Sequence, residues 1–74
     1  MSRLFSSSDV IRLLRRAGFE EISQRGSHKK LRAARKGQPY TVIVPHPAPE
    51  LPAGTFASIL RQAGMSRKEF EQYL

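Results

Sequence analysis

The stretch FEEISQRGSHKKLRAAR, residues 19–35, predicts a β-hairpin. One strand is expected over residues 19–24 and the next over residues 28–35. Gly26 and Ser27 form the turn between them, and a glycine at the first central position suits a two-residue type II′ turn because it tolerates a positive φ. A turn of this length determines how the two strands pair, so each side chain of the hairpin can be assigned to a face.

This pairing places Arg25 opposite His28 and Ile22 opposite Leu31. Successive side chains of a strand point to opposite faces, so Ile22, Leu31 and Ala33 share one apolar face. The apolar face must cover the core, which leaves the other face in solvent. That solvent face is expected to hold a histidine and three cations: Arg25, His28, Lys30 and Arg32.

Helical patterns stand on both sides of the hairpin. Apolar residues at helical spacing predict a helix over about residues 7–17, and Ser6 with Asp9 fits a capping box at its start. Beyond the hairpin we expect a third strand over residues 40–44, a second helix over about residues 53–63 and a short last helix over about residues 66–73.

This order predicts a single α+β domain over residues 1–74, an α-β-β-β-α arrangement with a short extra C-terminal helix. The three strands form an antiparallel sheet, and the helices pack on one of its faces. The expected core consists of Leu13, Leu14, Ile22, Leu31, Val42, Val44, Phe56, Ile59 and Leu60.

Charge is the strongest compositional feature of the chain. Thirteen Lys and Arg residues against six Asp and Glu residues give a net charge of +7. Residues 22–49 contain six of the basic residues, both histidines and no acid. This pattern favours a polyanionic partner such as RNA, and an ordinary solvated surface is the alternative.

Composition also excludes several classes of protein. The chain has no cysteine, which excludes disulfides, thiolate catalysis and cysteine-ligated zinc. The longest apolar run, residues 42–44, is far too short to span a membrane, and no signal peptide is visible at the N-terminus. We therefore expect a soluble, cytoplasmic protein without a cofactor or a metal site.

His28 allows two interpretations. It is either a surface histidine on a strand that binds nucleic acid, or a general acid/base for RNA cleavage. RNA supplies its own nucleophile in the 2′-hydroxyl, so an enzyme need only move a proton and stabilise the extra negative charge. Cations beside His28 suit that task, and Gly26 would let the backbone approach a phosphate closely.

His46 stands between two prolines at the expected end of the third strand. It either caps that strand or the second helix, or it binds phosphate or carries a second proton. The arginines of the first helix, Arg12, Arg15 and Arg16, also have two interpretations. They complement the negative end of the helix dipole, or they contact phosphate.

Four motifs together resemble the HicA toxins, RNA-cleaving partners of bacterial toxin–antitoxin pairs. They are RGSH at residues 25–28, VPHP at residues 44–47, GT at residues 54–55 and ILRQAG at residues 59–64. The resemblance implies a fold like that of double-stranded RNA-binding domains, an mRNA interferase activity, and a small acidic antitoxin of the HicB type. It also places His28 on the catalytic histidine of the family. The residues expected to bind RNA are Arg25, Gly26, Ser27, Lys29, Lys30, Arg32 and His46.

Three hypotheses follow for the function. The chain is a metal-independent ribonuclease toxin, a catalytically silent RNA-binding module on the same fold, or a basic protein that docks an acidic partner. The first predicts cleavage that depends on one imidazole, the second binding without cleavage, and the third weak and unspecific RNA binding.

Overall fold

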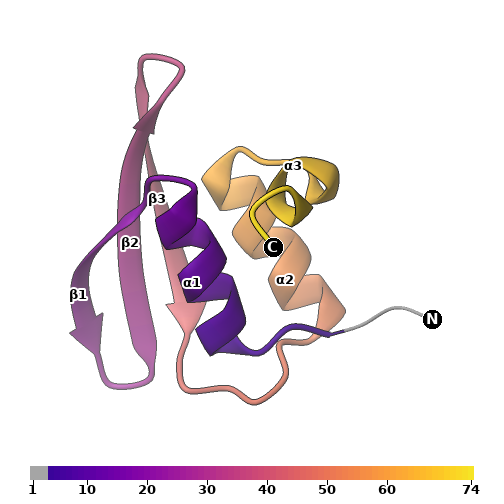
Figure 1. Cartoon of the computed structure of the whole chain (residues 1–74). Coiled ribbons are helices and arrows are strands. Elements are labelled where there is room, and N and C mark those ends of the chain that lie inside the picture. The colour runs from indigo at the N-terminus through magenta and orange to yellow at the C-terminus, as the bar shows by residue number, and fades with distance from the viewer. Residues whose placement is uncertain (1–3) are drawn as a thin grey trace.

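The chain folds into a single sheet that helices cover on one side (Figure 1). The computed structural model describes residues 4–74. Its three antiparallel strands lie in the order β1-β2-β3. The predicted α+β class is therefore confirmed. Among the described residues, no helix has the length and apolar character needed to cross a membrane. The elements are α1 (Ser7–Arg16), β1 (Glu20–Arg25), β2 (His28–Arg35), β3 (Gln38–Pro45), α2 (Ala53–Ala63) and α3 (Arg67–Glu71).

Helix α1 begins with the predicted capping box. The N–H of Asp9 donates to the Ser6 hydroxyl at 3.0 Å, and the N–H of Ser6 donates to the Asp9 carboxylate at 3.4 Å. Hydrogen bonding with the Ser6 side chain, aided by the Ser6 backbone and by Arg12, holds the pKa of Asp9 below its ordinary value of 3.8. At the other end, the N–H of Phe19 donates to the carbonyl of Leu14 at 2.9 Å, as in a Schellman motif.

The first hairpin keeps the predicted register only near its turn. Arg25 pairs with His28 as expected, but a bulge between Glu21 and Ser23 shifts the rest of β1 by one residue. Glu21, and not Ile22, therefore lies opposite Leu31. The prediction that Ile22 belongs to the core is wrong: its side chain is 49% exposed. A bulge leaves one residue of the strand unpaired, and all six residues of this edge strand are exposed.

The second hairpin is tighter than the sequence pattern indicated. Lys36 and Gly37 have φ values of 53° and 75°, as the two central residues of a type I′ turn require. Because this turn is only two residues long, β3 begins at Gln38 instead of Tyr40. Pro39 is tolerated in β3 because the strand lies at the edge of the sheet.

The core lies between the sheet and the three helices. All the predicted core residues other than Ile22 are buried. Three phenyl rings join the N-terminal segment to the last two helices: Phe5, Phe56 and Phe70 stand with their centroids 5.2 to 5.6 Å apart. Phe70 is fully buried, so α3 is anchored although it is only five residues long.

Candidate active site

His28 begins β2 and is exposed on the sheet face that the helices leave uncovered. A hollow of about 500 Å³ surrounds it, and its wall includes Arg25 and Lys30 together with Ser23 and Ile43. None of the described residues in this wall is acidic. We call this surface the open face and define it by Arg25, His28, Lys30 and Arg32, the four exposed residues predicted to share it.

The turn between β1 and β2 determines where the imidazole stands. Gly26 has a φ of 54°, which a glycine adopts without strain, and Ser27 has a negative φ, in agreement with the predicted II′ turn. A Cβ atom at Gly26 would meet no atom within 4 Å, so space is open around this backbone. The carbonyl of Ser27 accepts a hydrogen bond from the N–H of His46 at 2.8 Å, which ties the turn to the end of β3.

His46 has a structural partner that the sequence did not reveal. Its Nδ1 lies 2.8 Å from the hydroxyl of Ser7, the first residue of α1. Ser7 is buried, and its hydroxyl also accepts the N–H of Ala48 at 2.8 Å and lies 3.2 Å from the Ala48 carbonyl. The suggestion that His46 caps the second helix is wrong: α2 begins at Ala53, and no side chain caps it at its N-cap residue, Pro52. His46 instead links the end of β3 to α1.

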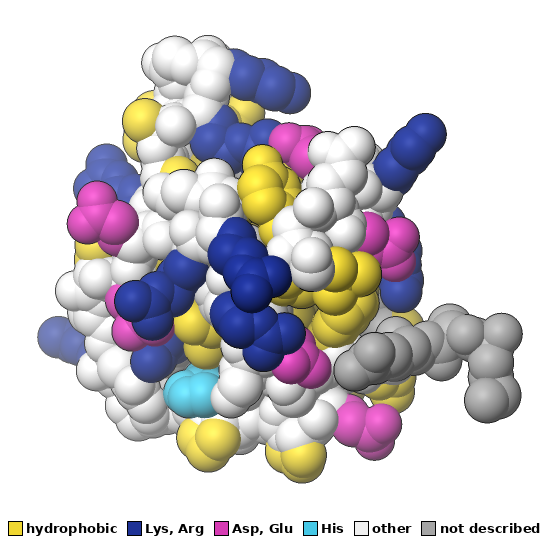
Figure 2. Space-filling model, in the orientation of Figure 1, with side chains coloured by type: hydrophobic (Ala, Val, Ile, Leu, Met, Phe, Trp, Pro, Cys, Tyr) yellow, Lys and Arg dark blue, Asp and Glu magenta, His cyan; other side chains and the backbone are white. Residues whose placement is uncertain are grey.

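A second hollow, of about 490 Å³, lies on the helix side of the sheet beside α1. In Figure 2, Lys and Arg side chains cross the middle of the face that α1 presents, and a histidine side chain lies below them. We call this hollow the α1 groove. It is lined by Ser8, Ile11, Arg12, Arg15, Arg16, Lys29 and His46.

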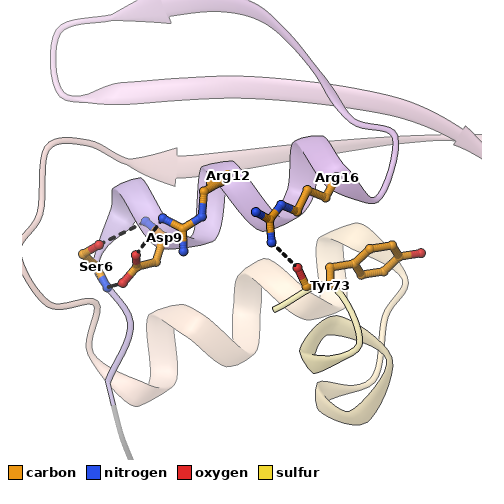
Figure 3. Close-up of polar contacts among 5 residues, drawn as sticks. All are labelled: Ser6, Asp9, Arg12, Arg16 and Tyr73. Carbon is orange, nitrogen blue, oxygen red and sulfur yellow. Dashed lines mark hydrogen bonds and ion pairs between the residues drawn. The ribbon is translucent and has the colours of Figure 1, made fainter.

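Each of the four Lys and Arg side chains of the α1 groove makes an ion pair or a hydrogen bond. Glu21 is shared by two of them, with Lys29 at 3.1 Å and Arg15 at 3.6 Å. Arg12 lies 3.2 Å from the Asp9 carboxylate. Arg16 donates to the backbone carbonyl of Tyr73 at 2.9 Å, and Figure 3 shows both arginines on the same side of α1.

The residues predicted to bind RNA are thus divided between two sides of the sheet. Arg25, Lys30 and Arg32 accompany His28 on the open face, whereas Lys29 and His46 line the α1 groove. Gly26 and Ser27 form the turn at the end of the hairpin. Sequence reasoning missed two features: the contact of Ser7 with His46 and the shared use of Glu21. The Ser7 contact joins residues 39 positions apart, and no local pattern signals it.

No three His, Cys, Asp or Glu side chains lie close enough together to hold a metal ion within residues 4–74.

Comparison with known proteins assigns the domain. Residues 7–65 match the family model described as the HicA toxin of bacterial toxin–antitoxin systems. The chain belongs to the HicA toxin family. No protein with a curated description matches it.

The matched segment of this HicA-family chain begins at Ser7 and ends just after α2. It contains the whole sheet, His28, His46 and the serine that holds His46. Helix α3 lies outside it. Both hollows are therefore formed by the part of the chain that defines a HicA toxin, and the resemblance read from four short motifs is confirmed.

Proposed function

We propose that this chain is an endoribonuclease that cleaves mRNA without a metal ion, with His28 as its general acid/base. One observation carries the proposal. An exposed imidazole stands at the start of β2, in a hollow whose wall includes Arg25 and Lys30 and no acidic side chain among the described residues. Membership in a family of toxins supports a destructive activity of this kind.

The chemistry uses the substrate's own nucleophile. His28 accepts the proton of a ribose 2′-hydroxyl, the 2′-oxygen forms a bond to the adjacent phosphorus, and the bond from phosphorus to the 5′-oxygen breaks. The leaving 5′-oxygen takes a proton from solvent, and the imidazolium returns its proton to solvent. The products are a 2′,3′-cyclic phosphate and a free 5′-hydroxyl.

The cations of the open face stabilise the charge that builds up during this step. Arg25 closes the turn directly opposite His28, and Lys30 follows two residues later on the same face. Their positive charges face the phosphate while its negative charge increases. Arg32 extends the cationic row along β2 and binds the next part of the RNA. The open space at Gly26 admits the RNA backbone beside the turn.

We further propose that the partner is a small acidic antitoxin of the HicB type that covers the open face. An acidic surface placed over Arg25, His28 and Lys30 would associate rapidly with this cationic face and exclude RNA from the imidazole. A complex in which His28 stays accessible would contradict this arrangement.

The test compares the wild-type protein with His28→Ala on one RNA, with EDTA present. The wild type should cleave, and its products should carry the cyclic phosphate. The same RNA with a single 2′-deoxyribose at the cut site should bind and stay intact. Equal cleavage by both proteins would exclude His28 as the catalytic residue. Binding without any cleavage by the wild type would leave a silent RNA-binding module.

A further inference from the structure

Basic side chains from three separate segments converge on the α1 groove. Helix α1 contributes Arg12, Arg15 and Arg16, strand β2 contributes Lys29, and the segment after β3 contributes His46. None of these side chains belongs to the open face, which lies on the other side of the sheet. Convergence of this kind needs an explanation that the proposed cleavage chemistry at His28 does not supply.

The groove keeps an excess of positive charge after its ion pairs are counted. Asp9 pairs with Arg12, and Glu21 serves both Arg15 and Lys29. Four cations against two carboxylates leave two positive charges in excess. The side chains of Arg12 and Arg15 are 54% and 65% exposed, so their pairs are weak and an incoming anion can replace them.

The imidazole of His46 is held in place before any ligand arrives. Its Nδ1 is engaged by the hydroxyl of Ser7, which is 1% exposed. That engagement leaves Nε2 as the ring nitrogen available to a ligand. Because Ser7 also bonds to both backbone groups of Ala48, the ring loses little further freedom on binding.

The groove also lies next to the proposed cleavage site along the hairpin. His28 pairs with Pro45 in the sheet. Directly beyond this pair, the N–H of His46 donates to the carbonyl of Ser27. The two imidazoles therefore start from the same corner of the sheet and stand on opposite sides of it. A strand of RNA that crosses the turn at this corner reaches both.

We propose that the α1 groove is a second phosphate site, which binds the RNA backbone at a nucleotide distant from the one that is cut. This inference rests on the proposed function, because it takes RNA to be the ligand. Guanidinium groups bind phosphate in a two-pronged geometry. An RNA strand that lies on the open face and passes the turn at residues 26–27 would reach these groups. An acidic protein partner is the competing occupant.

The binding test uses proteins that carry His28→Ala, so that the RNA stays intact. Arg12→Gln/Arg15→Gln removes two groove charges, and Arg61→Gln/Lys68→Gln removes two exposed charges from α2 and α3 as the matched control. Fluorescence anisotropy measures the Kd for a labelled RNA long enough to cross the turn, and for a dinucleotide. Thermal unfolding verifies that both double variants are folded.

We expect the groove variant to raise the Kd for the long RNA at least tenfold more than the control does. Its slope of log affinity against log salt should be shallower by about 1.4, which corresponds to two lost contacts with single-stranded phosphates. The dinucleotide, which fits on the open face alone, should bind equally well to both variants. His46→Gln should also raise the Kd for the long RNA, by a smaller factor.

Equal binding of the long RNA by the groove variant and the control would overturn the inference. So would a groove variant that keeps its RNA affinity and loses only its affinity for an acidic antitoxin, which would assign the groove to that protein. Neither result depends on cleavage. The proposed function is tested separately by wild-type cleavage, so a protein that binds RNA through the groove without cutting it would refute only the proposed activity.

Discussion

His28 and His46 start from one corner of the sheet and face two different environments. His28 is exposed in a hollow with Arg25 and Lys30, and no acidic residue contributes to the described wall of that hollow. His46 is half-buried, and a buried serine occupies its Nδ1. An imidazole that exchanges protons with a substrate has to be accessible, whereas one that holds a ligand benefits from a fixed ring. The two environments suit these two roles.

The acidic residues are also used differently in the two regions. Asp9 and Glu21 pair with cations of the α1 groove, and the pairs made by the exposed Arg12 and Arg15 are weak. None of the ion pairs among the described residues involves Arg25, Lys30 or Arg32, although Glu20 lies opposite Arg32 in the pairing of β1 with β2. The charges of Arg25 and Lys30 beside His28 are therefore available to a phosphate. The comparison predicts that changes on the open face alter the chemical step, and that changes in the groove alter binding.

The largest expected effect is a difference in kcat between the variants of the two histidines. His28→Ala should lower kcat by about 10² to 10⁴, the usual contribution of general acid/base catalysis, and leave RNA affinity and stability nearly unchanged because the side chain is exposed. His46→Ala should raise KM and change kcat far less. Single-turnover cleavage of one RNA, measured at several protein concentrations, gives the rate of the chemical step and the half-saturating concentration for each variant. If His46→Ala lost kcat as severely as His28→Ala, the proposed division of roles would be wrong.

A smaller effect should separate the neighbouring lysines of β2. Lys30 lies on the open face, and Lys29 points to the α1 groove. Lys30→Ala should lower kcat by roughly tenfold, less than the loss of a single oxyanion donor, because Arg25 shares the charge. Lys29→Ala should act mainly on KM. Steady-state kinetics on the same RNA measure kcat and KM for the two variants. Identical changes in kcat and KM for both lysines would contradict their assignment to opposite faces.

Stability should distinguish two adjacent serines of α1. Ser7→Ala removes the acceptor of the Ala48 N–H and the partner of His46, which should lower the free energy of unfolding by about 1 to 3 kcal/mol. Ser8→Ala is the matched control because Ser8 is exposed, and it should cost less than about 0.5 kcal/mol. Denaturant unfolding measures both. Equal costs would mean that the buried hydroxyl does not hold this corner together.

The smallest effect concerns the capping box at the start of α1. The pKa of Asp9 is lowered in the folded protein, so its carboxylate stabilises the fold above its ordinary pKa of 3.8 and loses that effect as the pH falls through the lowered value. At neutral pH, Asp9→Asn should cost only about a few tenths of a kcal/mol, because solvent screens the group. The melting temperatures of the wild type and of Asp9→Asn, measured against pH, should converge at the acid end. A difference that stayed constant with pH would exclude the carboxylate as its source.

Local chemistry was enough to predict most of the fold. Ser6 and Asp9 define the start of α1, and the Gly26–Ser27 turn aligns the first hairpin, as predicted. Caps and turns of this kind involve residues within a few positions of one another, so their hydrogen bonds can be read from the sequence. The strand alternation they impose also placed His28 among cations on the uncovered face.

The bulge in β1 shows where this local reasoning fails. Ile22 is apolar, β-branched and in phase with Leu31, yet it is exposed, and Glu21 takes the position opposite Leu31. An edge strand pairs on one side only, so an extra residue costs little there. The bulge in turn brings Glu21 within reach of both Lys29 and Arg15. The pairing of charges in the α1 groove therefore depends on an irregularity that alternation does not predict.

Residues close together in the chain account for the α+β order, the two-residue turn and the placement of His28 beside Arg25, because each of these features depends on neighbouring residues. The tertiary fold alone brings Lys29 and His46 together with the arginines of α1. That outcome depends on packing: α1 lies across the sheet, and its buried Ser7 meets the chain after β3, 39 residues away. Contacts over such separations follow from how the layers pack, which no local pattern encodes.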